Sequence, residues 1–182
     1  MTTPAYVCRL DTPLGPATAC AMDDALCGFW FIGQKYYPQA VRHWIEQPKY
    51  PVFPALRRWL DEYFAGAAPR PDFALTAQGT AFQKAVWDLL LHIPYGETTT
   101  YGELSKQLAA LCNLPSMSAQ AVGGAVGHNP ISLLIPCHRV VGSTGKLTGY
   151  AGGLDKKEAL LRLEKKQCLT KDNPPIFSGR RK

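Results

Sequence analysis

Cys137, His138 and Arg139 stand together after Pro136, and these residue types in this order suit nucleophilic chemistry. Two neighbouring cations can lower the pKa of a thiol and hold it as thiolate, the nucleophilic form. The apolar run 131–135 predicts a buried strand that ends at Pro136, because proline has no backbone donor. Adjacent side chains of an extended segment point to opposite faces, so contact between Cys137 and His138 requires a turn or a bridging water. An inert core cysteine is the alternative interpretation.

Motifs around this cysteine resemble those of the O6-alkylguanine-DNA alkyltransferase family. The matching stretches, in the same order as in the family, are 121–125 (AVGGA), 129–130 (NP), 135–140 (IPCHRV) and 149–154 (GYAGGL). The resemblance is specific over Thr80 to Glu164 and looser before. It implies DNA repair by irreversible transfer of the alkyl group from O6-alkylguanine, and from O4-alkylthymine, to Cys137. The product is a thioether that water cannot hydrolyse, so each chain acts once, with no cofactor.

The resemblance also assigns chemical roles to individual side chains. Cys137 is the alkyl acceptor, and His138 takes the thiol proton as general base through water. Glu164 orients His138 and stabilises its charge. Tyr101 donates a hydrogen bond to the flipped base as negative charge develops on it. Asn129 holds the active-site turn by hydrogen bonds from its side chain to the backbone.

The substrate pocket and the DNA contacts follow from the same matched positions. The expected pocket walls are Tyr150, Ala151, Gly152, Ser132 and Pro136. The expected contacts to double-stranded DNA, made through the minor groove, are Gly102, Gln120, Ala121, Gly123, Gly124, Arg139 and Ser143. Gln120 replaces the arginine with which relatives enter the duplex, and it lacks that planar charge. Close helix packing is the alternative use of Gly123 and Gly124.

The C-terminal elements must position these residues. Thr80 with Gln83 and Thr100 with Glu103 form capping-box patterns that begin two helices. A break at 113–116 separates the second of them from a third helix over 118–126. The pair fits a helix-turn-helix, although any pair of hairpin helices has a similar pattern. A last helix, opened by Asp155 and Glu158, carries Glu164.

The N-terminal part predicts a small antiparallel sheet and one helix. Apolar and polar residues alternate over 6–10 and 17–22, and 26–32 is a third apolar stretch. A helix is expected at 55–65. The resemblance implies a ribonuclease-H-like fold here, hence an α/β two-domain protein with a mainly α C-terminal domain. We expect a structural domain over 1–75, a catalytic domain over 80–168, and a basic tail over 169–182.

The charge and the cysteines limit the partners. The chain has 182 residues and a net charge of +6. Residues 165–182 hold six Lys or Arg and one Asp, so +5 of this charge lies in this C-terminal stretch, most of which we expect to be a disordered and solvated tail. No long apolar span and no signal peptide is evident, which predicts a cytoplasmic protein that does not contact membranes. We also expect a monomer.

Six cysteines without a Cys-x-x-Cys pair predict free thiols. Some relatives hold zinc in the N-terminal domain, but Met22 and Cys27 occupy positions where that pattern needs a cysteine and a histidine. We therefore expect no metal. Cys8, Cys20, Cys27 and His43 are the other candidate ligands, and their spacing matches no ligand motif.

Three other functions fit parts of this pattern. A protein that recognises alkylated DNA without chemistry is disfavoured by Cys137. A transcription regulator is disfavoured by the minor-groove pattern and by the lack of a second sensory domain. A cysteine hydrolase would use Cys137, His138 and Glu164, and it would turn over, whereas an alkyl acceptor would not.

Overall fold

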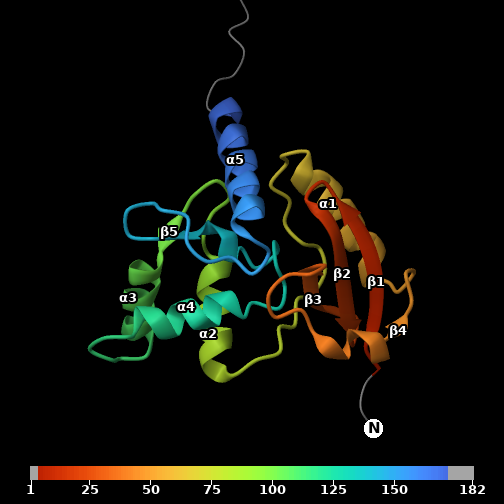
Figure 1. Cartoon of the computed structure of the whole chain (residues 1–182), viewed down its shortest axis with the longest axis horizontal. Coiled ribbons are helices and arrows are strands. Elements are labelled where there is room, and N and C mark those ends of the chain that lie inside the picture. Colours follow the sequence, from red (N-terminus) through yellow and green to blue (C-terminus); the bar gives the residue numbers. More distant parts are fainter. Residues whose placement is uncertain (1–3, 172–182) are drawn as a thin grey trace, which may run out of the picture.

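The first part of the chain folds into a sheet whose strands follow one another along the sequence. A computed structural model describes residues 4–171. The strands are β1 (Tyr6–Thr12), β2 (Gly15–Met22) and β3 (Ala25–Phe31), paired antiparallel in sequence order. After the short helix η1 (Gln39–His43), β4 (Ile45–Glu46) pairs with β1 in parallel. The predicted meander is confirmed, and β4 is an addition that the sequence pattern did not indicate (Figure 1).

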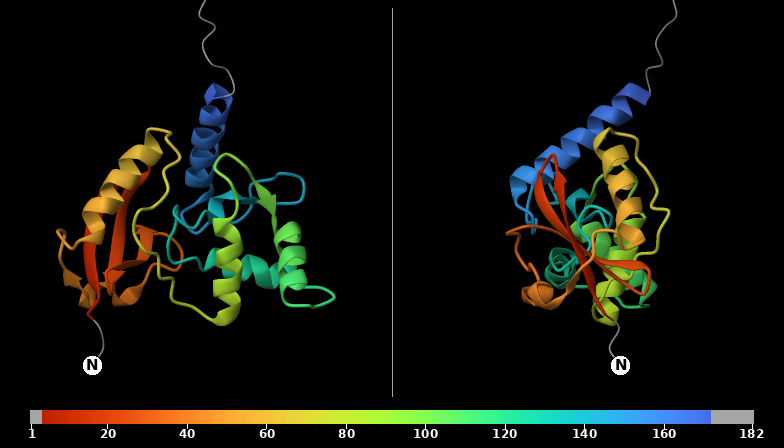
Figure 2. Two further views of the ribbon diagram at one scale, coloured as in Figure 1. Left: turned by 180° about the vertical axis from the view of Figure 1, so that it is seen from behind. Right: turned by 90° about the vertical axis from the view of Figure 1, so that its right-hand side faces the viewer.

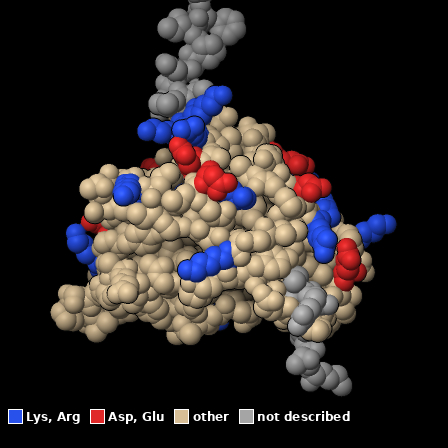
Figure 3. All heavy atoms as spheres, viewed as in Figure 1, with Lys and Arg blue, Asp and Glu red and all other residues tan. Residues whose placement is uncertain are grey.

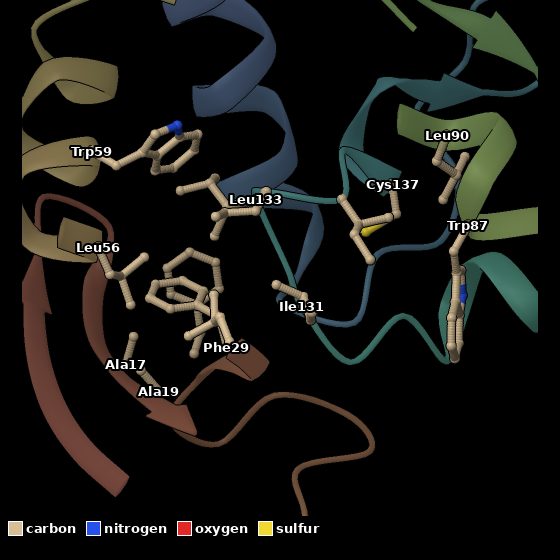
Figure 4. Packing of buried hydrophobic residues seen from close by; sticks show 14 of the residues in the cluster. Ala17, Ala19, Phe29, Leu56, Trp59, Trp87, Leu90, Ile131, Leu133 and Cys137 are labelled. Atoms are coloured by element: carbon tan, nitrogen blue, oxygen red, sulfur yellow. The ribbon is translucent and has the colours of Figure 1, made fainter. Parts of the chain in front are cut away.

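Helix α1 (Val52–Phe64) covers one face of this sheet. Leu56 is fully buried there, and the small side chains of Ala17 and Ala19 on β2 belong to the same core, which lets the helix approach closely (Figure 4). The helix begins three residues before the predicted 55–65, at Val52. Pro54 lies in the first turn, where a missing N–H costs no internal hydrogen bond.

The outer edge of β3 joins the two parts of the molecule. Phe29 donates its N–H to Pro130 O and accepts from Ser132 N, each at 2.9 Å. At the other end of the strand, Leu26 bonds in the same way to the segment 74–76. These contacts cover a strand edge that would otherwise expose unpaired backbone groups. They also place the active-site segment directly against the N-terminal sheet (Figure 4).

The second part consists mainly of helices. In chain order its elements are α2 (Ala81–Leu91), β5 (Thr99–Thr100), α3 (Tyr101–Leu111), α4 (Ala119–Gly127), η2 (Cys137–Arg139), β6 (Val140–Val141) and α5 (Leu154–Lys171). The capping box of Thr80 and Gln83 is confirmed in both directions. Thr100 accepts from Glu103 N, but the Glu103 carboxylate pairs with Lys106 instead of completing the box.

The predicted strand over 131–135 is wrong, although all five residues are buried. The Asn129 side chain accepts from Ile131 N at 2.9 Å and donates to Ile135 O at 2.7 Å, which folds the segment into a turn. Leu133 has φ 77°, a conformation that strands do not use. Side-chain to backbone hydrogen bonds therefore outweigh the apolar pattern here.

Helix α5 packs between the two parts (Figure 2). Gly66, just after α1, and Gly96 lie so close to Gln167 and Cys168 of α5 that a Cβ at either glycine would clash. The helix runs to Lys171, so residues 169–171 belong to α5 and not to the predicted tail. Residues 172–182, where we predicted disorder, lie outside the described residues.

Residues 4–171 contain neither a membrane-spanning helix nor a cluster of metal ligands. No helix within this range is long and apolar enough to cross a membrane. No three His, Cys, Asp or Glu side chains in it gather as metal ligands. Cys20 and Cys27 do lie together, with their sulfur atoms 3.1 Å apart.

Replacement of Phe29 by alanine tests how much the junction contributes. The side chain is fully buried between sheet and active-site segment, so Phe29→Ala should lower the free energy of unfolding by about 3–5 kcal/mol, as expected for a buried aromatic. Urea denaturation measures this change. Leu111→Ala, at a position 67% exposed, is the control and should change it by less than about 0.5 kcal/mol. Equal effects of the two substitutions would contradict this packing.

Candidate active site

Cys137 opens the one-turn helix η2 and is almost completely buried. The Asn129 amide donates to its sulfur at 3.1 Å, so the residue that shapes the turn also contacts the nucleophile. Burial raises the pKa of Cys137 above its ordinary value, while the Asn129 hydrogen bond and the charge of Lys157 lower it in part. A thiolate here therefore needs a base to take its proton.

His138 follows Cys137 in η2 and is fully buried. Successive residues of a 3₁₀ turn point about 120° apart, and accordingly the sulfur is bonded to Asn129 rather than to this imidazole. His138 Nε2 lies 2.8 Å from Glu164 Oε1, as expected from the resemblance. Burial lowers the pKa of His138 in spite of the opposing effect of Glu164, so the imidazole is neutral at pH 7. Its Nδ1 is buried and has no partner among the described residues.

The Glu164 carboxylate is fully buried and receives five hydrogen bonds. Oε1 accepts from His138, from Tyr63 at 2.6 Å and from Arg139 Nη2 at 2.9 Å. Oε2 accepts from Arg139 Nε at 2.9 Å and from Gly96 N at 3.1 Å. Burial alone would raise the pKa of Glu164, but the donors His138 and Arg139 outweigh it and lower the pKa to about 2. The carboxylate is therefore ionised, and His138 carries its proton on Nε2.

A buried ammonium lies close enough to the nucleophile to act on its charge. Lys157 of α5 donates to the carbonyls of Val140, Thr148 and Gly149 at 2.6, 2.7 and 3.1 Å. Burial lowers the pKa of Lys157 to about 8, although the charge of Cys137 acts in the opposite direction and raises this pKa. The three carbonyls fix the loop that precedes Tyr150, and the positive charge favours a thiolate at Cys137.

Cys137 opens onto a cavity of about 430 Å³ between the two parts of the molecule. Tyr101, Tyr150 and Ala151 line it, as predicted. The complete lining is Lys35, Tyr36, Tyr101, Gln120, Gly123, Gly124, Val126, Gly127, Cys137, Gly149, Tyr150 and Ala151. The Tyr101 hydroxyl donates to Thr148 O at 3.3 Å, so it already points to the loop that borders the cavity.

Three predicted wall residues do not line this cavity. Ser132 is buried and donates to Gln34 Oε1 at 3.4 Å, because the turn over 131–135 directs it toward the N-terminal sheet. Pro136 faces a second cavity of about 530 Å³, on the side of Tyr63. Gly152 packs against the Tyr150 ring so closely that its Cβ would lie 2.8 Å away.

Most of the predicted DNA contacts lie at the surface. Gly102, Gln120, Ala121, Gly124 and Ser143 are exposed, and Gly123 is half-buried. A Cβ at Gly124 would meet nothing within 4 Å, so packing inside the protein does not require a glycine there.

Arg139 is the exception, and its assignment to DNA is corrected. Its guanidinium is paired with Glu164 and donates to Ile93 O at 2.6 Å, with only 11% of the side chain exposed. A cation held by a buried carboxylate and a carbonyl is not free to bind a phosphate.

Four residues of this site were not predicted from the sequence. Tyr63 and Lys157 appeared as ordinary helix positions, since only the packing of α1 and α5 brings them here. Lys35 and Tyr36 follow β3 and reach the cavity because Lys35 N donates to Ala151 O at 2.9 Å and Tyr36 stacks on His128 at 3.9 Å. A lysine among the apolar residues of α5 was the one available signal.

Comparisons with known proteins agree with this architecture. Residues 6–76 match the family model of the 6-O-methylguanine DNA methyltransferase ribonuclease-like domain, and residues 81–166 match that of its DNA binding domain. A methylated-DNA–protein-cysteine methyltransferase of Mycobacterium bovis is 45% identical over 159 residues, 87% of this chain and 92% of the relative. One of Methanosarcina acetivorans is 42% identical, over 87% of this chain and 97% of its own. The crystal structure of Mycobacterium tuberculosis OGT in complex with DNA has a TM-score of 0.79 and 42% identity, covering 89% of this chain and 94% of that one.

The carboxylate at the centre of the site should make stability depend on acid. The pKa of Glu164 is about 2 when folded and 4.5 ordinarily, so its stabilisation is complete above pH 4.5 and is lost as the pH falls toward 2. Urea unfolding between pH 6 and pH 3 should show a steeper loss for the wild type than for Glu164→Gln. Glu158→Gln, on the same helix but exposed and paired with Arg162, should behave like the wild type. Parallel curves for wild type and Glu164→Gln would contradict the assignment.

Proposed function

The chain belongs to the 6-O-methylguanine DNA methyltransferase family, and we propose that it repairs alkylated DNA through Cys137. The alkyl group comes from O6 of guanine, and from O4 of thymine, in double-stranded DNA. The observation that carries this proposal is the position of the Cys137 sulfur, which borders a cavity and lies beside a neutral His138 paired with Glu164. These are the parts that thiolate chemistry requires.

The proposed transfer begins with the thiol proton. His138 Nδ1 is the free basic atom of the imidazole, because Nε2 is committed to Glu164. It takes the proton of Cys137 through water, and Glu164 stabilises the resulting imidazolium. Asn129 and Lys157 stabilise the thiolate by a hydrogen bond and by charge.

The second step forms one bond and breaks another. The thiolate attacks the alkyl carbon in line, a C–S bond forms, the C–O6 bond breaks, and guanine leaves with the electron pair. Tyr101, whose hydroxyl borders the cavity, donates to the base as this negative charge develops. The alkylated cysteine has no bond that water can cleave, so the protein acts once.

The base must leave the duplex to reach Cys137, because this residue is only 5% exposed and lines the cavity. We propose that α4 enters the minor groove as the second helix of a helix-turn-helix with α3. Gln120 and Gly124 both face the cavity mouth from α4. Neither α4 nor the residues between α3 and α4 carry a charge, and Figure 3 shows an uncharged area there. A local basic patch therefore does not explain binding here. The small residues of α4, which let the backbone approach DNA closely, support this mode instead.

Other classes of function fit less well. A protein that only recognises the lesion does not need a cysteine bonded to Asn129 beside a base and a carboxylate. A hydrolase would release its product and turn over, which the mass measurement below detects. We further propose that the protein acts as a monomer in the cytoplasm.

Intact mass after incubation with an oligonucleotide that carries O6-methylguanine tests the reaction. The wild type should gain one methyl group and saturate at one per chain, whereas Cys137→Ser should gain none, because serine is not a comparable nucleophile at this site. Cys112→Ser, which removes an exposed thiol, is the matched control and should react like the wild type. Continued turnover, or methylation of Cys137→Ser, would reject Cys137 as the terminal acceptor.

Gly124→Ala separates DNA binding from folding. The new Cβ has open space and alanine favours helices, so the free energy of unfolding should stay equal or rise by up to about 1 kcal/mol. The same methyl group would stand between α4 and the groove, so affinity for duplex DNA should fall severalfold in a fluorescence anisotropy titration. Unchanged affinity would contradict the proposed docking of this helix face.

A further inference from the structure

We propose that Tyr63, from the N-terminal part of the molecule, is a positioning residue that sets the basicity of His138 through Glu164. This inference rests on the function proposed above, in which His138 accepts the thiol proton. It gives the N-terminal part a role in the chemistry beyond structural support. The experiment below separates its failure from failure of the transfer reaction itself.

The Tyr63 hydroxyl lies at the centre of the charged network. It donates to Glu164 Oε1 at 2.6 Å, which is shorter than the 2.8 Å between that oxygen and His138 Nε2. Its distance to His138 Nε2 is 3.4 Å. The side chain is 1% exposed, so no bulk water competes with these contacts.

Tyr63 can act only as a donor to this carboxylate. Glu164 is ionised and has no proton to give, and burial together with the Glu164 charge raises the pKa of Tyr63, which keeps its own proton in place. Tyr63, His138 and Arg139 all donate to Oε1 of Glu164. Each donor therefore reduces the negative charge that this oxygen offers to the other two. The Tyr63 hydroxyl therefore reduces the attraction between Glu164 and a protonated His138.

The packing of α1 holds the hydroxyl in place. The Tyr63 ring stacks on Trp59 at 5.1 Å and meets the edge of Tyr95 at 5.8 Å. Trp59 is anchored in turn, because its indole N–H donates to Pro69 O at 3.0 Å. The orientation of the hydroxyl thus depends on the helix that covers the N-terminal sheet.

Tyr95 does not share this role, although its ring lies in the same cluster. The Tyr95 hydroxyl is buried and has no hydrogen-bond partner among the described residues. Its ring contacts the Arg139 guanidinium at 5.5 Å instead. Within the described chain, Tyr63 is therefore the tyrosine that bonds the carboxylate.

Tyr63→Phe removes the hydroxyl and keeps the stacked ring. Without this donor, Glu164 should hold the imidazolium more strongly, and the pKa of His138 should rise by about 0.5–1 unit. The acid limb of the pH profile of methyl transfer should move to higher pH by the same amount. The transfer rate at a pH below this limb should fall severalfold, whereas affinity for DNA should not change.

The experiment measures single-turnover transfer from an O6-methylguanine oligonucleotide between pH 5 and pH 9. It compares wild type, Tyr63→Phe and Tyr50→Phe, with the His138 imidazole titrated in parallel by NMR. Tyr50 precedes α1, and its exposed hydroxyl accepts from Asp24 N far from the site, so Tyr50→Phe controls for loss of a tyrosine hydroxyl. A shift in Tyr63→Phe alone is the expected result. Superimposable profiles and imidazole titrations for all three proteins would overturn the proposal.

Two further measurements cover the remaining outcomes. If Tyr63→Phe unfolds, 3-fluorotyrosine at position 63 keeps the contact and is a stronger donor, so the His138 pKa should fall; an unchanged or raised pKa would overturn the proposal. If the wild type transfers no methyl group, the proposed function fails, and the NMR titration still decides whether Tyr63 controls His138.

Discussion

The buried carboxylate of Glu164 is the interaction on which the rest of the structure depends. A carboxylate that is buried away from water destabilises the fold unless hydrogen-bond donors satisfy its oxygen atoms. Here the donors come from α1, from the turn at Gly96 and from η2, so satisfying one carboxylate brings three separate segments together with α5. The same bonds fix the tautomer of His138. The hydrogen bonds that stabilise Glu164 therefore both hold the segments of the fold together and keep His138 in the tautomer that accepts a proton.

The nucleophile depends on a second constraint, the turn shaped by Asn129. This side chain satisfies two backbone groups of the turn and the sulfur of Cys137 at once. The turn is pinned to the edge of β3 through Phe29, so its position is also controlled by the N-terminal sheet. The N-terminal part therefore supports the turn that holds the nucleophile through Phe29, and it contacts the carboxylate that orients the base through Tyr63.

The face of α4 that we propose to contact DNA differs in composition from the interior. In the interior both oxygens of the Glu164 carboxylate accept hydrogen bonds, and the Arg139 guanidinium is held by this carboxylate. On α4 the glycine at 124 leaves space that no part of the protein uses. Small, uncharged residues let a backbone approach a groove, and Lys35 and Tyr36 add a cation and an aromatic ring at the mouth of the cavity.

The sequence by itself determined what local chemistry controls. The three strands, the cap of Thr80 on α2 and the cap of Thr100 on α3 depend on neighbours within a few residues, and the motif around Cys137 indicated the family through residue types and order. The tertiary structure decided everything that depends on distant partners. The apolar run 131–135 became a turn because Asn129 captured its backbone, Arg139 turned inward because Glu164 required a cation, and Tyr63 and Lys157 joined the site because α1 and α5 pack against η2 and its loop. Such contacts join residues up to 101 positions apart, and no local pattern records them because burial, which gives them their strength, exists only in the folded chain.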